Sequence, residues 1–475
     1  MKSSQHERDN PQIELFKVEL WRIVDASHEM VKLADIIDWE NFEGTFVQMW
    51  QPQGRPSIDT RVMVSLHYLK YTYDLSDEEV VESWLQNPYW QYLSGMRYFQ
   101  HTRVLDPSSM SRWRKRAGKA GLEQLLTETI RAGLKLKAVK TSQLKRVNID
   151  TTVQEKHIRY PTDSRLYDRA RQRLVKQAEC EGIRLRQNYK RVGHNVLIQQ
   201  QRYAHARQFN RADKCQKTLR TLLGRVIRDI ERKAQELMEG SPLASLLETA
   251  KGIHTQQRSD KNKIYSVHAL EVQCISKGKV HKRYEFGVKA SIATTSKGGW
   301  HVGAMSLPGH PYDGHTLSQC FKQIKTISPR IPEHLFTDQG YRGHGLSLEQ
   351  TQIHVDKKRR GRTPQRLWSW MKRRAAIEPG IVHLKAQHRL NRNRLWGHQA
   401  DMHNVILSAA AINFHKLLKH IRLLWLYIFR PLFSILHHHK VLFSGSTNYY
   451  IITLKKPLYF FVYCVCIQLL CLDTK

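Results

Sequence analysis

The first part of the chain spaces its apolar residues as helices do. Apolar side chains recur three or four positions apart from residue 57 to about residue 133, for example at Ile58, Val62 and Leu69. This spacing places them on one face of a helix. Residues 1–45 mix short apolar runs with charges, so we expect an N-terminal helical arm there.

Charged residues and a proline mark the helix boundaries in this part. The acidic run from Asp77 is expected to begin one helix and Pro88 to end it. Ser108 or Ser109 is expected to be the N-cap of a further helix. Residues 46–140 are therefore predicted to form an all-α domain.

The first turns of that further helix carry four basic residues, which are Arg112, Arg114, Lys115 and Arg116. Several short helices that end in one with a basic N-terminal half are typical of helix-turn-helix-like DNA readers. The alternative is an ordinary helical bundle with a solvated basic face. We expect these four residues to contact DNA.

The rest of the chain alternates expected strands and helices. The expected strands are 146–153, 264–275, 284–295, 300–310, 334–338 and 352–357. Expected helices fill an Arg- and Gln-rich block at 164–250 and then cover 315–327 and 365–390. Without that block, the order is that of a ribonuclease-H-like α/β domain. We therefore predict a ribonuclease-H-like catalytic domain over residues 141–419, with a helical insertion after its first strand.

The basic insertion has two interpretations. It is either an arm that grips DNA or a pair of helices with solvated charges. Its arginines fall on most sides of the expected helices, which favours contact with DNA over a one-sided protein interface. They include Arg165, Arg169, Arg171, Arg173, Arg184 and Arg186.

Composition points to a nucleic-acid partner. The 475 residues include 77 Lys and Arg against 42 Asp and Glu, a net charge of +35, and the excess is spread along the chain. Such a field attracts phosphate polyanions. A ribosomal protein and a membrane-surface binder are the alternatives, but 41% hydrophobic residues and 11 Trp indicate globular cores.

Cysteines and the N-terminus indicate a reducing compartment. None of the seven Cys forms a CxxC pair, so neither a zinc ribbon nor a disulfide framework is predicted. The first residues are polar and have no apolar signal core. We expect a cytoplasmic, nucleoid-associated bacterial protein.

Three acidic residues are placed where phosphodiester chemistry could use them. That chemistry needs two divalent ions about 4 Å apart, one at the attacking oxygen and one at the leaving oxygen. Mg²⁺ prefers oxygen ligands, so two Asp on neighbouring strands and one acid on an adjacent helix suffice. Asp150 and Asp338 are expected at strand ends, and Glu378 on the last helix.

Glu378 has basic neighbours at helical spacing. Arg374 is four residues before it and Lys385 is seven after it, so all three are expected near one face. Both cations could hold phosphates beside a metal ligand. Pro379 removes a backbone donor, which predicts a kink or break at Glu378.

Spacing alone does not select these three acids. Strand-end Asp residues are more often turn or cap residues, and a helical Glu between cations is usually part of a surface ion pair. Competing acids near expected strand ends or in loops are Asp163, Glu271, Asp313 and Asp356.

Three blocks of sequence resemble a known family. RVNIDTTV, FTDQGYRG and RAAIEPGIVHLK are similar to the catalytic blocks of DDE transposases from bacterial insertion sequences, in the InsH-like (insertion-sequence-five) group. LPGHPYDGHTL and LYDRARQRLVKQA also resemble that group, and the resemblance covers about residues 40–418. It implies that Asp150, Asp338 and Glu378 bind the metal ions.

The resemblance also implies the remaining features of the site. Tyr341 and Arg342 would shape the site after the second Asp, and two Mg²⁺ ions, or Mn²⁺ in their place, would be the cofactors. Arg374, Glu378 and Lys385 match the family's Tyr-Arg-Glu-Lys signature, whereas Met371 stands where Tyr would be. The N-terminal helices would recognise the terminal inverted repeats.

The expected activity is cleavage of DNA at the inverted repeats and joining of the 3′-OH ends to target DNA by a homodimer. A nuclease that does not join ends and a catalytically dead DNA-binding remnant are the alternatives. Residues 420–475 are apolar, aromatic and poor in acids. We interpret them as a read-through or frameshifted tail rather than a membrane anchor, because the longest apolar run is shorter than a spanning helix.

Overall fold

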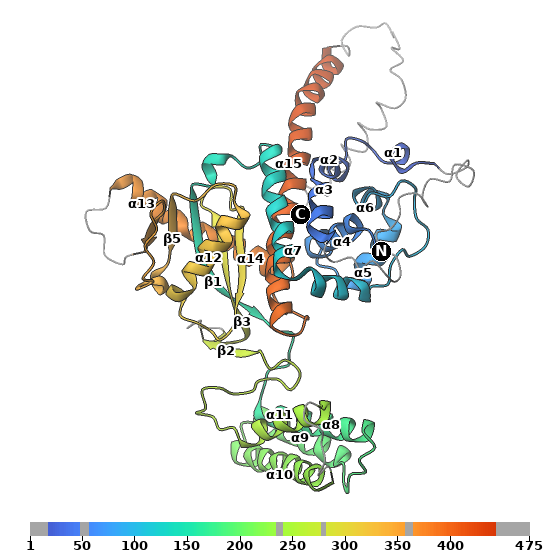
Figure 1. Ribbon diagram of the computed structural model, residues 1–475, viewed down its shortest axis with the longest axis vertical. Helices are drawn as coiled ribbons and strands as arrows, with labels where there is room; N and C mark the ends of the chain where they lie inside the picture. Colours follow the sequence, from blue (N-terminus) through green and yellow to red (C-terminus); the bar gives the residue numbers. More distant parts are fainter. Residues whose placement is uncertain (1–17, 48–56, 234–240, 277–281, 357–363, 443–475) are drawn as a thin grey trace. The chain divides into compact units, whose positions relative to one another are not determined.

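A mixed β-sheet organises the part of the chain that is predicted to be catalytic (Figure 1). The computed structural model describes residues 18–47, 57–233, 241–276, 282–356 and 364–442, with side chains described as far as residue 425. The six strands run in the order β2-β3-β1-β5-β6, and β4 also pairs with β3. They are β1 (Arg146–Glu155), β2 (Gln273–Ser276), β3 (Tyr284–Thr295), β4 (His301–Leu307), β5 (His334–Thr337) and β6 (Gln352–Val355).

Strand β1 lies at the centre of the sheet and is longer than expected. It pairs antiparallel with β3 as far as Glu155 and parallel with β5. Asp150 therefore lies in the middle of its strand, and the prediction that it ends the strand is wrong. The β-branched residues after it favour continued strand structure. A Cβ on Gly287 of β3 would overlap the backbone oxygen of Gln154, so glycine permits this close pairing.

The expected strand at 264–275 is mostly wrong. Only its last residues enter β2, and the chain before them forms turns. Leu270 is exposed rather than buried. The Glu271 side chain turns inward to Lys156, with 2.8 Å between carboxylate and ammonium. Burial of this ion pair replaces the alternating pattern of a strand.

Helices cover both faces of the sheet. Helix α12 (Asp313–Ile327) packs on β3 and β4, and α14 (Ile377–Gln387) packs on β1 and β3. Cys320 of α12 donates to Ser291, which pairs with Thr151 of β1. Asn148 of β1 instead contacts the chain just before α14. Because odd and even strand residues point to opposite faces, α12 and α14 lie on opposite faces.

The expected helix at 365–390 is divided into three parts. They are α13 (Gln365–Lys372), the 3-10 helix η5 (Arg373–Ala376) and α14, and they are followed by α15 (His398–Leu442). Pro379 is therefore in the first turn of α14, where a missing backbone donor costs no helical hydrogen bond. The break predicted at Glu378 occurs just before it.

Within the described residues, seven α-helices precede the sheet. They are α1 (Leu20–Ile23), α2 (Glu29–Ile36), α3 (Trp39–Phe46), α4 (Thr60–Thr72), α5 (Asp77–Gln86), α6 (Pro88–Leu93) and α7 (Ser108–Lys135). Helix α5 begins at Asp77 as predicted, with a capping box from Ser76. Neither Ser108 nor Ser109 is an N-cap, because the Asp106 carboxylate accepts from the Ser108 amide instead.

Two large hydrophobic cores, and a small third one of Leu20, Val24 and Val31, hold the described residues together. One joins the N-terminal helices to the sheet, α12 and α15. Because this core continues across residues 140 and 141, packing does not mark the domain boundary predicted there, and that boundary stays a proposal about function. The other joins four helices that lie between β1 and β2 in sequence. They are α8 (Asp163–Cys180), α9 (Lys190–His205), α10 (Phe209–Lys233) and α11 (Pro242–Thr255).

The chain divides into two units after Ile421. Residues 1–17 of the expected arm and 443–475 of the expected tail lie outside the described residues, as does Lys357 at the end of the last expected strand. Among the described helices, none combines the length and apolar character needed to cross a membrane.

Candidate active site

Two of the three predicted acids lie abreast on neighbouring strands. In the parallel pairing of β1 with β5, Asn148 lies opposite Phe336. Two residues further along, the same register brings Asp150 level with Asp338, just past the last residue of β5. Neighbouring strands are about 4.8 Å apart, and residues paired in register point to the same face. The sheet therefore brings two carboxylates that are distant in sequence close together, at the carboxyl end of β5.

Each of these carboxylates is oriented by local backbone hydrogen bonds. Asp338 caps the 3-10 helix η4 (Gln339–Tyr341), and its Oδ1 accepts from the Gly340 amide at 3.0 Å. Asp150 Oδ1 accepts from the Thr151 amide at 2.7 Å. These backbone contacts involve only the Oδ1 atom of each carboxylate.

The third acid arrives on the same face from α14. Asn148, which shares a face with Asp150, donates from Nδ2 to the backbone oxygen of Arg373 at 3.0 Å. Four residues beyond that backbone group, the chain enters α14, and Glu378 lies in its first turn. The segment that carries Glu378 therefore crosses the sheet on the face of Asp150.

Arg374 connects the acids. Its guanidinium nitrogens lie 3.8 Å from an Asp150 oxygen, 3.9 Å from Glu378 and 3.9 Å from Asp356. Arg374 and Asp150 are each 17% exposed, whereas Glu378 is 62% exposed. The helical spacing of Arg374 and Glu378 is as predicted. In this structure Arg374 contacts carboxylates, and its contact with a phosphate stays a prediction.

The donor set fits hard divalent cations. Within the described part of the chain, no three acidic, His or Cys side chains are gathered tightly enough to enclose an ion. The carboxylates of Asp150 and Glu378 nevertheless share one cationic partner, Arg374, and Asp338 lies level with Asp150. Oxygen donors of this kind on rigid elements are what Mg²⁺ prefers, so these residues fit the predicted ions.

Comparison with known proteins gives this arrangement a family. The transposase domain family DUF772 matches residues 18–116, and the transposase DDE domain family matches residues 250–414. The chain belongs to the DDE transposase family. This confirms the family predicted from the three sequence blocks, and with it an enzyme that acts on DNA. The family implies the ribonuclease-H-like fold, with which the mixed sheet agrees.

A relative matches part of the chain, and its name states no function. The protein ORF8 of the nfe locus of Rhizobium meliloti is 49% identical over 196 residues, which is 41% of the transposase chain and 95% of the relative. No solved structure matches the chain. The DDE match contains Asp338 and Glu378 but begins after Asp150. The prediction that Asp150 belongs to the site therefore rests on its position beside Asp338 in the sheet.

The turn after Asp338 is held in place by a buried side chain. Tyr341 is fully buried, and burial raises the pKa of its hydroxyl well above the usual range, with Cys320 and the Asp313 carboxylate adding to the shift. Arg342 is exposed, and its backbone oxygen accepts from the Tyr312 hydroxyl at 2.9 Å. Tyr341 thus acts as a packing anchor, while Arg342 faces solvent.

Asp313, one of the competing acids in the sequence, also lies close to the turn after Asp338. Its Oδ1 lies 2.8 Å from the ammonium of the buried Lys289. A Cβ on Gly340 would lie 3.0 Å from Asp313 Oδ2 and 3.1 Å from Asp338 Oδ1, so both carboxylates face one point of the turn. The stretch PYDGHT, which resembles the family, was the available signal.

The other competing acids have partners of their own. Asp163 lies 3.7 Å from the Lys263 ammonium, and Glu271 is in the ion pair with Lys156. Asp356 shares Arg374 with the predicted triad but is more exposed than Asp150. Lys385, predicted to hold phosphate, is partly buried and 3.8 Å from Glu285; that prediction stays untested.

The basic residues of α7 divide into two kinds. Arg112, Lys115 and Arg116 are exposed. Arg114 is buried and donates twice to the Asp77 carboxylate, at 2.8 and 2.6 Å. The prediction that Arg114 contacts DNA is therefore corrected: its guanidinium joins α7 to α5 and has no free face for a phosphate.

Proposed function

We propose that this transposase cleaves DNA at the terminal inverted repeats of its insertion sequence and joins the 3′-OH ends to target DNA. Asp150, Asp338 and Glu378 would form its metal-binding triad. The register of β1 with β5 carries the proposal, because it places Asp150 and Asp338 level on the face that Glu378 approaches. Family membership supports the transposition reaction.

The three carboxylates would hold two Mg²⁺ ions, for which Mn²⁺ could substitute. When bound, the ions would activate the attacking oxygen and stabilise the leaving oxygen of a phosphodiester. The chain's own residues set the positions of these ligands. The Gly340 amide fixes the Asp338 carboxylate, and Arg374 holds Asp150 and Glu378 near each other before substrate arrives.

Substrate recognition is assigned to the basic surfaces. The exposed Arg112, Lys115 and Arg116 of α7 would contact the inverted repeats, and Arg342 and Lys385 would contact DNA near the triad. A homodimer would hold two ends together in the synaptic complex, on the nucleoid. We place the protein in the InsH-like group on its three sequence blocks.

Metal-dependent cleavage of the element's own end tests the triad. Asp150→Asn, Asp338→Asn and Glu378→Gln are each expected to abolish cleavage while binding to the end remains nearly intact. Asp356→Asn is the matched control, because Asp356 also contacts Arg374 but stands outside the triad. Wild-type-like cleavage by one triad variant would remove that residue from the site, and loss of cleavage in the control would point to a general charge effect.

Strand transfer needs a second assay, with pre-cut ends and a target duplex. Joined product that depends on Asp338 is expected. Cleavage without joining would indicate a nuclease of the same fold, and end binding without either reaction would indicate a catalytically dead remnant.

A further inference from the structure

Helix α10 presents one row of cations to solvent. Its exposed Arg and Lys side chains include a row on the outer side, made of Arg211, Lys214, Arg225, Arg228 and Arg232. Lys217 and Lys233 are exposed beside this row, and Arg220 is exposed on another side of the helix. At 100° per residue these five positions fall within a sector of about 100°. Thr218 and Thr221, also exposed, fill the middle of the same row. The helix therefore carries a continuous polar, cationic face along its length.

The opposite side of α10 is committed to packing. Its apolar residues are buried in the second hydrophobic core, against α8 and α11. The exposed acids of the helix are directed elsewhere: Glu231 binds the Lys251 ammonium at 3.1 Å, and Asp213 falls outside the cationic sector. The core fixes which side faces outward, so the row of cations is a defined surface.

Not every arginine of the insertion is exposed. Arg171 is almost completely buried and binds the Asp168 carboxylate at 2.6 Å. It also donates to the backbone oxygen of Asn188. The sequence pattern could not separate such a core arginine from the exposed ones.

The C-terminal end of the row opens into a basic hollow. Arg184, Arg186, Arg232 and Lys233 line it, with one acid, Asp229. Asp229 is largely buried and already accepts from the Arg186 amide and the Lys233 ammonium. The cationic side chains therefore outnumber the single carboxylate, and the hollow suits an anion.

We propose that the α10 face and this hollow bind the phosphate backbone of double-stranded DNA without reading its sequence. From Arg211 to Arg232 the helix rises about 31 Å, close to one turn of duplex, about 34 Å. Cations at this density displace counterions from DNA. The identity of the ligand as DNA rests on the proposed function.

Charge argues against a second copy of the chain as the occupant. Each copy carries a net charge of +35 and would present the same cationic row. Like charges three or four residues apart also destabilise a helix slightly. Arg225, Arg228 and Arg232 are so spaced, although Arg232 also lies 3.6 Å from the Asp229 carboxylate and donates to the Arg228 backbone oxygen.

The test is the triple variant Arg225→Gln, Arg228→Gln and Arg232→Gln in the full chain. Binding to a fluorescent duplex of unrelated sequence is measured by anisotropy against salt concentration, with Asp338→Asn in every protein to prevent cleavage. Each phosphate contact contributes about 0.9 to the salt slope, so we expect the slope to fall by two to three and affinity at low salt to fall about 10-fold or more.

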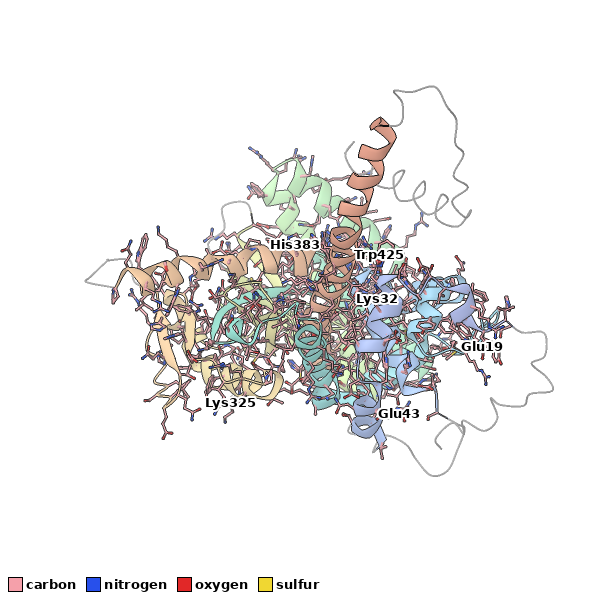
Figure 2. All side chains as sticks on the ribbon, turned by 90° about the horizontal axis from the view of Figure 1, so that it is seen from above. Glu19, Lys32, Glu43, Lys325, His383 and Trp425 are labelled. Carbon is pink, nitrogen blue, oxygen red and sulfur yellow. The ribbon has the colours of Figure 1, made fainter. Side chains whose placement is uncertain are left out.

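The matched control removes three exposed lysines elsewhere: Lys297→Gln, Lys322→Gln and Lys325→Gln. Lys325 lies on α12, at the outer edge of the structure (Figure 2). This control has the same net charge as the α10 variant and should keep nearly the wild-type slope. An equal loss in both variants would mean that only total charge matters, and would overturn the proposal.

Two further outcomes would overturn it. An unchanged slope in a folded α10 variant would show that DNA does not contact this face. Loss of self-association or of an acidic protein partner, with DNA binding retained, would make the face a protein interface. Because binding is measured without cleavage, a failed triad test and a failed α10 test are distinguishable. The α10 variant should unfold at a urea concentration close to that of its parent, because relief of repulsion among the three arginines offsets the loss of the contact between Arg232 and Asp229.

Discussion

The ion pair between Lys289 and Asp313 should set both the stability of the packing of α12 on β3 and the position of the turn after Asp338. Lys289 is 6% exposed, and its ammonium has two oxygen partners, Asp313 Oδ1 at 2.8 Å and the Pro311 backbone oxygen at 2.9 Å. Asp313→Asn removes a negative charge that balances this buried cation. A Cβ on Gly340 would touch both Asp313 Oδ2 and Asp338 Oδ1, so the turn after Asp338 passes close to the other carboxylate oxygen of Asp313.

The expected size of the effect follows from burial. Removing one partner of a fully buried ion pair costs about 3–5 kcal/mol, because the remaining charge stays desolvated. Asp313 is 19% exposed, so water can partly solvate the site and we expect about 2–3 kcal/mol. The double variant Lys289→Met with Asp313→Asn should lose less than the sum of the single variants.

Urea denaturation of the four proteins, followed by tryptophan fluorescence, measures this cycle. Asp163→Asn is the control, because Asp163 is also the first residue of a helix and also pairs with a lysine, but at 3.7 Å and with 34% exposure. It shares any helix-dipole contribution, yet its exposed ion pair should be worth less than about 1 kcal/mol.

Cleavage assays on the same proteins separate packing from positioning. If Asp313 positions the Asp338 turn, Asp313→Asn should lower the single-turnover cleavage rate of the folded protein while leaving affinity for the DNA end unchanged. Additive energies in the cycle, or Asp313→Asn as stable as wild type, would refute the reasoning. Full cleavage by a destabilised variant would confine the pair to a structural role.

Two other predictions concern the N-terminal helices. Asp77→Asn should lower the free energy of unfolding, measured in urea, by about 3 kcal/mol, because it leaves the buried Arg114 without its carboxylate partner. Although burial opposes ionisation, hydrogen bonds from Arg114 lower the pKa of Asp77. Its stabilising effect is therefore complete above the unfolded pKa of about 4 and is lost progressively as pH falls toward the lower folded pKa, so a wild-type–variant gap that does not narrow between pH 5 and pH 2 would contradict it. Arg112→Ala with Arg116→Ala should weaken end binding and lower the salt slope by about two; an unchanged slope would leave recognition to the insertion.

Sequence reasoning located most elements because their patterns are local. The strands at β3, β4, β5 and β6 and the helix at α12 were predicted within a few residues. It failed at residues 264–272, where an ion pair between Glu271 and Lys156 decides the conformation. Such a partner is more than a hundred residues away, so no local pattern contains it.

The same limit applied to the basic residues. Arg112 and Arg114 are two positions apart in one basic run, yet one faces solvent and the other binds Asp77. The Arg171–Asp168 pair within α8 shows the same outcome. In a chain this basic, charge density predicts a nucleic-acid partner, but burial decides which cations can reach it.

Selection among the acids required the topology of the sheet. Spacing could not rank Asp150 above Asp313 or Asp356. The register of β1 with β5 brings Asp150 level with Asp338, but the register of β5 with β6 brings Asp356 level with Asp338 in the same way, so the lower exposure of Asp150, 17% against 44%, is what favours it over Asp356. The structure then adds a feature that no motif indicated: acids at this edge are held by cations, Asp313 by Lys289 and both Asp150 and Glu378 by Arg374.

That pairing has a consequence for binding. An incoming phosphate attracts Arg374, and divalent ions attract the carboxylates that Arg374 now contacts, so the two ligands should help each other to bind. DNA would draw the guanidinium away from Asp150 and Glu378 and free their oxygens, while ions would release the guanidinium to the phosphate. The contacts of 3.8 and 3.9 Å are longer than direct hydrogen bonds, so the exchange costs little. An arginine among acids is in this way compatible with a metal-dependent site in a strongly cationic protein.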